Sequence, residues 1–277
     1  MMRIDTQPGV MGAIASGIDL SGPVGADDAA RLKQALLDHH LLCIRGQKLE
    51  PETYVKAARL FGEPQKQLLD DYQLDESNEV SVISNYNQLG GDRPHVRATH
   101  WHTDDSYFAK PARVTMLLAK ALPTSGGGTG FIDTMRVLDE MPAELRARIE
   151  GRRAVHKYLS RRNVAKVAER TAEQEAMTPD VTHPLIRTIP EDGRQALYIN
   201  PNRIDHIEGM TDEDSDELLD ALYAHAFQEK FQHRHDWQLG DLVMWDNACT
   251  MHRAGTDFEL TELREFHRVL LQGDVPA

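Results

Sequence analysis

The chain has 277 residues, enough for one large domain or two small ones, and 40% of them are apolar with charges of both signs among them. This composition is typical of a folded globular protein. A formal net charge of −13 argues against a nucleic-acid partner, because phosphate binding requires concentrated Lys and Arg. It does not exclude a small anionic ligand, since a few arginines in a pocket can outweigh the overall charge locally.

The cysteine usage and the hydropathy pattern indicate a cellular compartment. Cys43 and Cys249 lie far apart and form no CxxC motif, which is typical of packing residues in a reducing cytoplasm. No segment approaches the length of a membrane span. Asp5 precedes the short apolar patch near the N-terminus, so we expect no export signal. The sequence therefore predicts a cytoplasmic protein without a membrane partner.

The first 120 residues predict alternating helices and strands. An amphipathic helix with an acidic start covers 25–40, and the apolar segment 41–46 predicts a strand directly after it. A second helix over 50–62 has a proline near its start and a glycine after its end. Apolar and β-branched residues at 79–87 and 113–122 predict two further strands.

The rest of the chain predicts a helical middle and a return to strands. Residues 134–180 are charged and predict a helical insertion, and 211–231 predicts a helix with an acidic first turn and a lysine in its last. Strands follow within 233–255 and 262–273. No repeat or low-complexity linker divides the chain, so we expect residues 1–277 to form a single domain. Early and late strands without regular βα alternation favour a mainly β, α+β fold, with a double-stranded β-helix (jelly-roll) core and flanking helices.

The stretch "THWHTDDSY" carries the first candidate metal ligands. His100, His102 and Asp104 stand at every second position, so on a strand they would share one face. His252 is a further candidate, because it lies on an apolar strand just past a turn. His102, Asp104 and His252 would form a 2-His-1-carboxylate set that leaves three metal positions open, as in non-haem Fe(II) oxygenases. We expect His100 to lie beside the metal without binding it.

Two arginines near the C-terminus are candidate anion-binding residues. If a turn lies near 257–261, the strand that carries His252 pairs with a return strand through 264–268. Arg264 and Arg268 would then share a face, roughly 13 Å apart, and could bind two different anions, since guanidinium suits carboxylates and sulfonates. Surface pairing with Glu259 and Glu262 is the alternative.

The segment "LPTSGGGTGF" contains three consecutive glycines. It lacks the lysine of a P-loop and the strand–helix context of a dinucleotide fold, which disfavours a phosphate cradle. We expect a tight turn that lets the backbone pass close to a ligand, with the Thr129 hydroxyl beside it.

These motifs together resemble the taurine and 2,4-dichlorophenoxyacetate dioxygenases, which are Fe(II)- and 2-oxoglutarate-dependent enzymes on a jelly-roll core. The resemblance runs from "GAIASGIDLSGPV" through "WHTDDSY" and "LPTSGGGTGF" to "GDLVMWDNACTMHRA" and "LREFHR". It implies oxidation of a small anionic substrate with O2, release of succinate and CO2, and a homo-oligomer. The resemblance implies these roles: iron ligands His102, Asp104 and His252; 2-oxoglutarate binding by Arg264 with Thr129; and contact of Arg268 with the anionic group of the substrate.

The chain departs from the taurine enzymes at three positions. Those enzymes have histidines shortly after the second helix and an amide side chain four residues before the first metal histidine, where this chain has Gln65, Gln67 and Ala98. The departures disfavour taurine itself. Asp105 would suit a substrate with a cationic group, although strand alternation turns it away from the ligands.

Two other functions stay open from the residues alone. The same three ligands could hold Zn²⁺ and activate water for hydrolysis, but no clear general base is found beside them and the two arginines are then unexplained. A non-catalytic, anion-binding jelly roll is the other alternative, and the intact ligand set argues against it.

Overall fold

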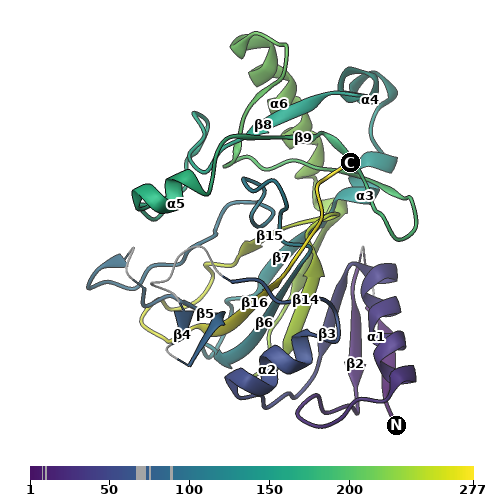
Figure 1. The fold of residues 1–277 in the computed structure, drawn as a ribbon, viewed down its shortest axis with the longest axis vertical. Coiled ribbons are helices and arrows are strands. Elements are labelled where there is room, and N and C mark those ends of the chain that lie inside the picture. The colour runs from purple at the N-terminus through teal and green to yellow at the C-terminus, as the bar shows by residue number, and fades with distance from the viewer. Residues whose placement is uncertain (8, 10, 67–72, 75, 88–89) are drawn as a thin grey trace.

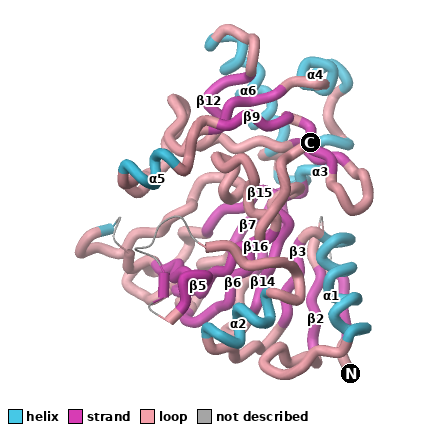
Figure 2. Tube along the Cα trace, viewed as in Figure 1, coloured by secondary structure: helices cyan, strands magenta, loops and turns pink. Residues whose placement is uncertain are grey.

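The computed structural model describes residues 1–277 except 8, 10, 67–72, 75 and 88–89, so Gln67 lies outside the described residues. In Figure 1 the lower half of the molecule is built on a large sheet, and the upper half holds most of the remaining helices around smaller sheets. Figure 2 shows that long loops connect these strands. The N-terminus lies at the foot of the large sheet, and the C-terminus lies near the upper helices.

The large sheet has eight strands, and its neighbouring strands are antiparallel except for one parallel pair, β2 with β3. In spatial order the strands are β1 (Arg3–Thr6), β2 (Ala13–Ser16), β3 (Leu41–Ile44), β14 (Leu242–Asp246), β6 (Val114–Ala121), β16 (Glu265–Leu271), β5 (Ser77–Ser84) and β4 (Gln73–Leu74). The strands expected within 41–46, 79–87 and 113–122 are therefore confirmed.

Two helices cover the outer face of this sheet (Figure 1). Helix α1 (Ala26–His39) buries Leu32 and Leu36, and it ends at His40, whose φ of 61° stops the helix while its N–H donates to the Leu36 carbonyl oxygen. Helix α2 (Pro51–Ala58) starts at a proline, which suits the first helical position. Both predicted helices are thus confirmed, and they pack into one apolar core with β3, β6 and β14.

Strand β6 supports both that core and a cavity on the other face of the sheet. Met116 and Leu118 are at most 1% exposed and pack with the helices. Thr115 and Leu117 line the cavity. Because successive side chains of a strand point to opposite faces, alternate residues of β6 serve these two environments.

A second, three-stranded sheet lies on the other side of the cavity. It consists of β13 (Gln232–His235), β7 (Thr129–Asp133) and β15 (Thr250–Ala254), antiparallel in the order β13-β7-β15. An isolated bridge adds His102 to its edge: the N–H of His102 donates to the His252 carbonyl oxygen at 3.1 Å, and the reverse bond measures 2.8 Å.

The pairing expected for the strand of His252 is wrong. Strand β15 pairs with β7, whereas β16 pairs with β5 and β6 of the large sheet. Residues 255–264 form the connection between the two sheets, and this connection is too long for a tight hairpin. Arg264 and Arg268 nevertheless reach the same cavity, because an even spacing along an extended chain keeps them on one face.

The middle of the chain is less helical than expected. Residues 134–180 contain three short helices, α3 (Thr134–Asp139), α4 (Ala143–Ile149) and α5 (Ala172–Ala176), but also strand β8 (Arg153–His156) and a segment without regular structure over 157–171. In β8, buried Ala154 and His156 alternate with more exposed neighbours, which is the period of a strand. The high charge content of this region concealed that period in the sequence.

The upper half is completed by short strands and one long helix, which share a second apolar core. The strands are β9 (Val181–Pro184), β10 (Ile186–Thr188), β11 (Gln195–Leu197) and β12 (Ile204–Ile207). Helix α6 (Asp212–Ala226) has the predicted acidic first turn, but it ends before Lys230, which lies in a 3-10 turn, η3 (Glu229–Phe231). Among the described helices, none is both long and apolar enough to span a membrane.

Candidate metal centre and active site

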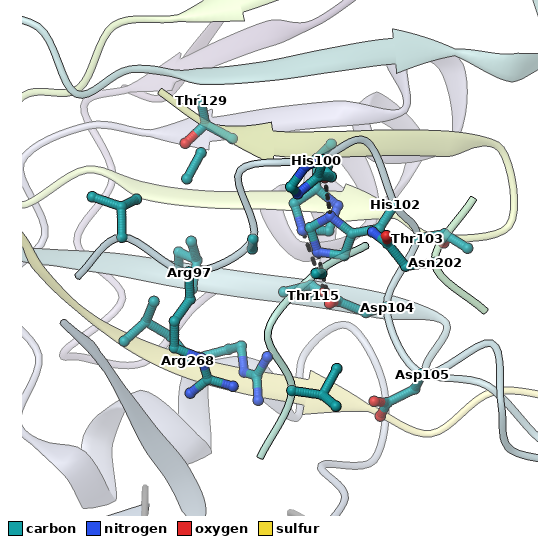
Figure 3. Close-up of a pocket in the computed structure, with 18 of the residues that line it drawn as sticks. Arg97, His100, His102, Thr103, Asp104, Asp105, Thr115, Thr129, Asn202 and Arg268 are labelled. Atoms are coloured by element: carbon teal, nitrogen blue, oxygen red, sulfur yellow. Dashed lines mark hydrogen bonds and ion pairs between the residues drawn. The ribbon is translucent and has the colours of Figure 1, made fainter. Parts of the chain in front are cut away.

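The three predicted metal ligands come together at the cavity, and Figure 3 shows two of them, His102 and Asp104, close to each other. His102 Nε2 lies 3.7 Å from Asp104 Oδ1, and His252 Nε2 lies 3.7 Å from Asp104 Oδ2. One donor atom from each residue lies within 4.8 Å of the others. Two imidazoles and a carboxylate at this spacing could hold a divalent transition metal on one face and leave its other positions open.

The local backbone differs from the predicted strand. His102 forms only the isolated bridge to β15, and the chain turns directly after it, so Asp104 lies in a turn. His252 is on strand β15, as expected. The HxD spacing still brings the ligands together, because the turn directs the Asp104 carboxylate back toward the two rings.

Burial and neighbouring charges set the protonation states of the ligands. Burial acts to raise the pKa of Asp104, but the adjacent His252 and His102, the charge of Arg268 and a hydrogen bond from Thr115 outweigh it and hold the pKa at about 2. Burial, with His102 nearby, lowers the pKa of His252 to about 3. At neutral pH the carboxylate is therefore ionised and this imidazole neutral, the forms that bind a metal.

A hydrogen-bond chain holds Asp104 in place. Thr115 Oγ1 donates to Asp104 Oδ2 at 2.6 Å, and Asn247 Nδ2 donates to the same hydroxyl at 2.8 Å. Trp245 Nε1 in turn donates to Asn247 Oδ1 at 3.1 Å. Partners of this kind orient a ligand and tune its affinity for metal. Nothing in the sequence pattern identifies Thr115 or Asn247 as partners of a metal ligand.

His100 lies beside the ligands and does not join them. It lines the cavity, and its backbone oxygen lies 2.9 Å from His102 Nδ1. This contact leaves His102 Nε2 directed toward Asp104. The expectation that His100 is a neighbour and not a ligand agrees with its absence from the described group of converging donor atoms.

Arg264 and Thr129 form a second part of the site. Arg264 is 6% exposed, its Nε donates to the Gly127 carbonyl oxygen at 2.8 Å, and its Nη2 lies 3.4 Å from Thr129 Oγ1. Burial lowers the Arg264 pKa to about 10, so the side chain remains charged at neutral pH. A buried guanidinium is costly without a counter-ion, and this one lines the cavity.

The alternative of surface pairing for Arg264 is wrong. Glu262 accepts hydrogen bonds from the backbone and hydroxyl of Thr124, and Glu259 accepts from Thr261. In the described parts of the chain, no ion pair joins either glutamate to Arg264. The buried charge is therefore available to an anion that enters the cavity.

The glycine run brings the backbone close to other segments of the protein, whereas the expected close approach to a ligand stays a prediction. Gly126 has φ of +72°, and a Cβ there would lie 1.8 Å from the Asp257 carbonyl oxygen. Gly127 has φ of +67°, and its Cβ would lie 3.3 Å from the Arg264 side chain. Only glycine fits where these segments pass each other. Their close approach helps to fix the position of Arg264 in the cavity.

Arg268 lies on another wall of the cavity. It belongs to β16, and its Nε lies 3.3 Å from Ser81 Oγ on the neighbouring strand β5. Figure 3 shows Arg268 and Arg97 on one side of His102 and Asp104. The cavity holds about 220 Å³, less than the roughly 300–1,000 Å³ of sites for drug-sized ligands. It therefore suits small organic acids.

Asp105 is not turned away from the site, contrary to the sequence prediction. It has φ of 56°, which redirects its side chain so that it lines the cavity. Gln65 Nε2 donates to one carboxylate oxygen at 3.0 Å and the Tyr107 hydroxyl to the other at 3.2 Å. Burial and the nearby Asp104 charge raise its pKa to about 6. Both carboxylate oxygens of Asp105 accept a hydrogen bond from another side chain, so Asp105 is part of the cavity wall.

A second group of possible ligands occurs among the described residues. Cys43, His235 and Asp241 are all buried and their donor atoms converge. Arg45 forms an ion pair with Asp241, and His235 Nε2 lies 3.2 Å from the same carboxylate. Burial raises the pKa of the Cys43 thiol above its usual range, so the thiolate that metals bind is disfavoured. This group fits a structural network, and Cys43 is the packing residue that the sequence predicts.

Comparisons with known proteins agree with this geometry. Residues 4–270 match the model of a family described as taurine catabolism dioxygenase TauD, TfdA family. The chain is 33% identical to alpha-ketoglutarate-dependent 2,4-dichlorophenoxyacetate dioxygenase of Burkholderia sp. (strain RASC), over 92% of this chain and 89% of the relative. It is 32% identical to pentalenolactone F synthase of Streptomyces avermitilis, over 100% and 96%. A solved structure of a taurine dioxygenase from Burkholderia xenovorans superposes with a TM-score of 0.84 at 30% identity, covering 100% of this chain and 91% of that one.

Proposed function

The chain belongs to the TauD, TfdA family of dioxygenases, and we propose how the residues of its cavity divide the work of the reaction. The protein is an alpha-ketoglutarate-dependent dioxygenase that uses Fe(II), 2-oxoglutarate (alpha-ketoglutarate) and O2 and acts on a small anionic substrate. In such a reaction one oxygen atom enters the substrate and the other enters succinate, while 2-oxoglutarate loses CO2.

The metal would be held by His102, Asp104 and His252. Their donor set fits Fe(II): two neutral imidazoles and one ionised carboxylate, with the other ring nitrogen of His102 already engaged by the His100 backbone oxygen. When bound, iron supplies the activation of dioxygen and two positions for 2-oxoglutarate. The protein orients the ligands through Thr115 and Asn247.

The co-substrate would be held at its far end by Arg264 with Thr129. The observation that carries this assignment is the charge of Arg264, which is buried, lines the cavity and forms no ion pair with any residue that the structure describes. A dicarboxylate that binds metal at one end would bring its second carboxylate to this guanidinium. A zinc hydrolase would leave the buried charge unexplained, and the family membership argues against both that function and a non-catalytic module.

Arg268 would bind the acidic group of the primary substrate. It lines the cavity, and Figure 3 shows it on the other side of the cavity from Thr129. We propose a small organic acid as substrate, an aryloxyalkanoate, an alkylsulfonate or sulfate, or a similar carboxylate. The name of the relative that oxidises 2,4-dichlorophenoxyacetate supports this class. The residues would hold one C–H bond of the acid near the metal and exclude others.

We also propose the finer features of the architecture. The large sheet and the sheet of β13, β7 and β15, which flank the cavity, are proposed to form a double-stranded β-helix, within one domain over residues 1–277. The buried free thiols of Cys43 and Cys249 support a cytoplasmic location. The homo-oligomer stays a prediction.

The test is O2-dependent release of succinate from 2-oxoglutarate with Fe(II), for a panel of aryloxyalkanoates, alkylsulfonates, alkyl sulfates and amino acids. We expect one class of acid to raise turnover well above the rate without substrate, and Arg268→Ala to abolish that increase. A visible charge-transfer band on addition of 2-oxoglutarate would distinguish iron from zinc. No succinate from iron-loaded protein with any compound would contradict the proposal.

A further inference from the structure

Arg203 is a further cation that lines the cavity, besides Arg97, Lys166, Arg264 and Arg268. It is the last residue of a turn before β12, and the turn is fixed by bonds from Asn202 and Arg203 N–H groups to Asn200 oxygens at 3.2 and 3.1 Å. The carbonyl oxygen of Arg203 accepts from the Lys157 N–H at 2.8 Å. The backbone that carries Arg203 is thus held on both sides.

The guanidinium of Arg203 is held against two aromatic rings. Its Cζ lies 4.9 Å from the centroid of Tyr107 and 4.8 Å from that of Tyr158, and the two rings meet edge to face at 5.1 Å. Nη1 donates to the Tyr158 carbonyl oxygen. A stacked guanidinium loses less conformational freedom when it binds a ligand, because its plane is already oriented.

Among the residues that the structure describes, no carboxylate forms a hydrogen bond or an ion pair with Arg203. The hydrogen bonds and ring contacts of Arg203 are those given above, and none involves a carboxylate. Asp105 is the nearest candidate along the cavity wall, but its two oxygens accept from Gln65 and Tyr107. The remaining donors of the guanidinium are available to a ligand.

Arg203 and Arg268 line the same cavity as the metal-ligand candidates His102, Asp104 and His252. The two arginines come from separate parts of the fold, the turn before β12 and strand β16. A ligand that contacts both would lie in the cavity that holds the metal-ligand candidates.

We propose that the primary substrate carries two acidic groups, one bound by Arg268 and the other by Arg203. The inference rests on the proposed function and narrows it from small acids to compounds with two oxyanions separated by a short carbon chain. We place the carbon to be oxidised between the two acidic groups, because both guanidiniums line the cavity that holds the metal-ligand candidates. Each arginine can form paired hydrogen bonds with one oxyanion.

The experiment compares straight-chain dicarboxylates of four to eight carbons with their mono-methyl esters. Because the dicarboxylates resemble succinate and would interfere with its detection, turnover is measured as oxygen consumption. Binding is measured by calorimetry on protein loaded with Mn(II) and 2-oxoglutarate. We expect kcat/KM and affinity for at least one diacid to exceed those of its half-ester by about 10- to 100-fold, the typical range for one charge-assisted pair of hydrogen bonds.

Variants separate recognition from structure. Arg203→Met keeps the stem that packs on the tyrosines but removes the charge, so the ratio of diacid to half-ester should fall toward one, and Arg203→Lys should restore part of it. Arg170→Met is the matched control: the Arg170 guanidinium stacks on Tyr158 at 4.1 Å but does not line the cavity, so the ratio should stay at the wild-type value.

Two results would overturn the inference. The first is that no diacid of the series is preferred over its half-ester. The second is that Arg203→Met lowers the activities with diacid and half-ester equally, so that their ratio does not change. That result would mean that Arg203 only supports Tyr107 and Tyr158. Half-esters or other monoacids that are oxidised equally well would leave the dioxygenase proposal intact. Absence of oxygen consumption with every acid, including monoacids, would instead count against the proposed function.

Discussion

Arg264 Nη2 lies 3.4 Å from Thr129 Oγ1, although 135 positions separate the two residues in the chain. The contact joins the start of β16 in the large sheet to the start of β7 in the second sheet. It also links two residues that the family resemblance assigns to the same carboxylate. The geometry of this pair depends on how the two sheets face each other across the cavity.

Substitutions of Arg264 and of Thr129 should each raise the KM for 2-oxoglutarate, but by different amounts. Arg264→Met removes a buried charge–charge contact, and we expect an increase on the order of 100-fold. Thr129→Val removes one neutral hydrogen bond, which should cost about five-fold. Initial rates against 2-oxoglutarate concentration measure both. Arg234→Met is the control, because Arg234 lies against Gly128 but outside the cavity; equal effects of Arg264→Met and Arg234→Met would contradict the assignment.

Each of the three metal-ligand candidates should be needed for iron binding. We expect His102→Ala, Asp104→Ala and His252→Ala to lose most bound iron, because a facial set of three has no spare ligand. Metal analysis after anaerobic loading and desalting measures this. His100→Ala provides the comparison, since His100 lines the same cavity without joining the converging donors. It should keep stoichiometric iron, and loss of iron there would show that the ligand set is wrong.

Thr115 should tune the metal through Asp104. Thr115→Val removes the hydrogen bond of 2.6 Å to the Asp104 carboxylate with little change in shape, and we expect iron affinity to fall by about 10-fold. Thr115→Ser keeps the hydroxyl and should restore most of the affinity. Competition with a coloured chelator gives both values. If valine and serine variants bind iron alike, the hydroxyl does not act through the ligand.

Buried His183 predicts a loss of stability at mildly acidic pH. Burial lowers its pKa from 6.5 to about 4, despite a contact of 3.0 Å with the Phe108 carbonyl oxygen. His183 therefore binds a proton more weakly in the folded protein than in the unfolded chain. The free energy of unfolding should fall as the pH drops from about 6.5 to about 4, because protonation of His183 then favours the unfolded chain. This residue alone contributes up to about 3 kcal/mol to the fall.

Urea unfolding of the wild type and of His183→Phe at pH 7.5, 6 and 5 tests this dependence. At pH 7.5 His183 of the wild type is neutral, as is the phenylalanine that replaces it. The measurement at this pH therefore shows whether the variant folds. The difference in free energy between pH 7.5 and pH 5 should be smaller in His183→Phe than in the wild type. Parallel pH curves for the two proteins would show that His183 does not carry the effect.

Much of the site could be predicted from the sequence because its residues lie in short, ordered motifs. The HxD spacing identified His102 and Asp104, and the apolar strand after a turn identified His252. The reason given for the HxD spacing was nevertheless wrong, since Asp104 and Asp105 lie in a turn. Alternation along a strand cannot reveal a φ of 56° at Asp105, and so the sequence misplaced its side chain.

Other features depend on contacts between distant parts of the chain. The pairing of β15 with β7 could not be read from the sequence, because neighbouring strands in the sequence usually pair and 255–264 carries ordinary turn residues. Thr115 looks like any β-branched strand residue, and Arg203 stands in "INPNRID" without a periodic signal. Only the folded chain brings Arg203 onto Tyr107 and Tyr158.

The alternation along β6 has a consequence for how this enzyme can change. Met116 and Leu118 face the core, whereas Thr115 and Leu117 face the cavity. Mutations at Met116 and Leu118 should mainly reduce the yield of folded protein. Mutations at Thr115 should mainly weaken the metal site, and mutations at Leu117 should alter which compounds are oxidised. A lineage could therefore acquire a new substrate at Leu117 without changing the core beneath the helices, provided that the new side chain still packs with Phe131 and Phe266.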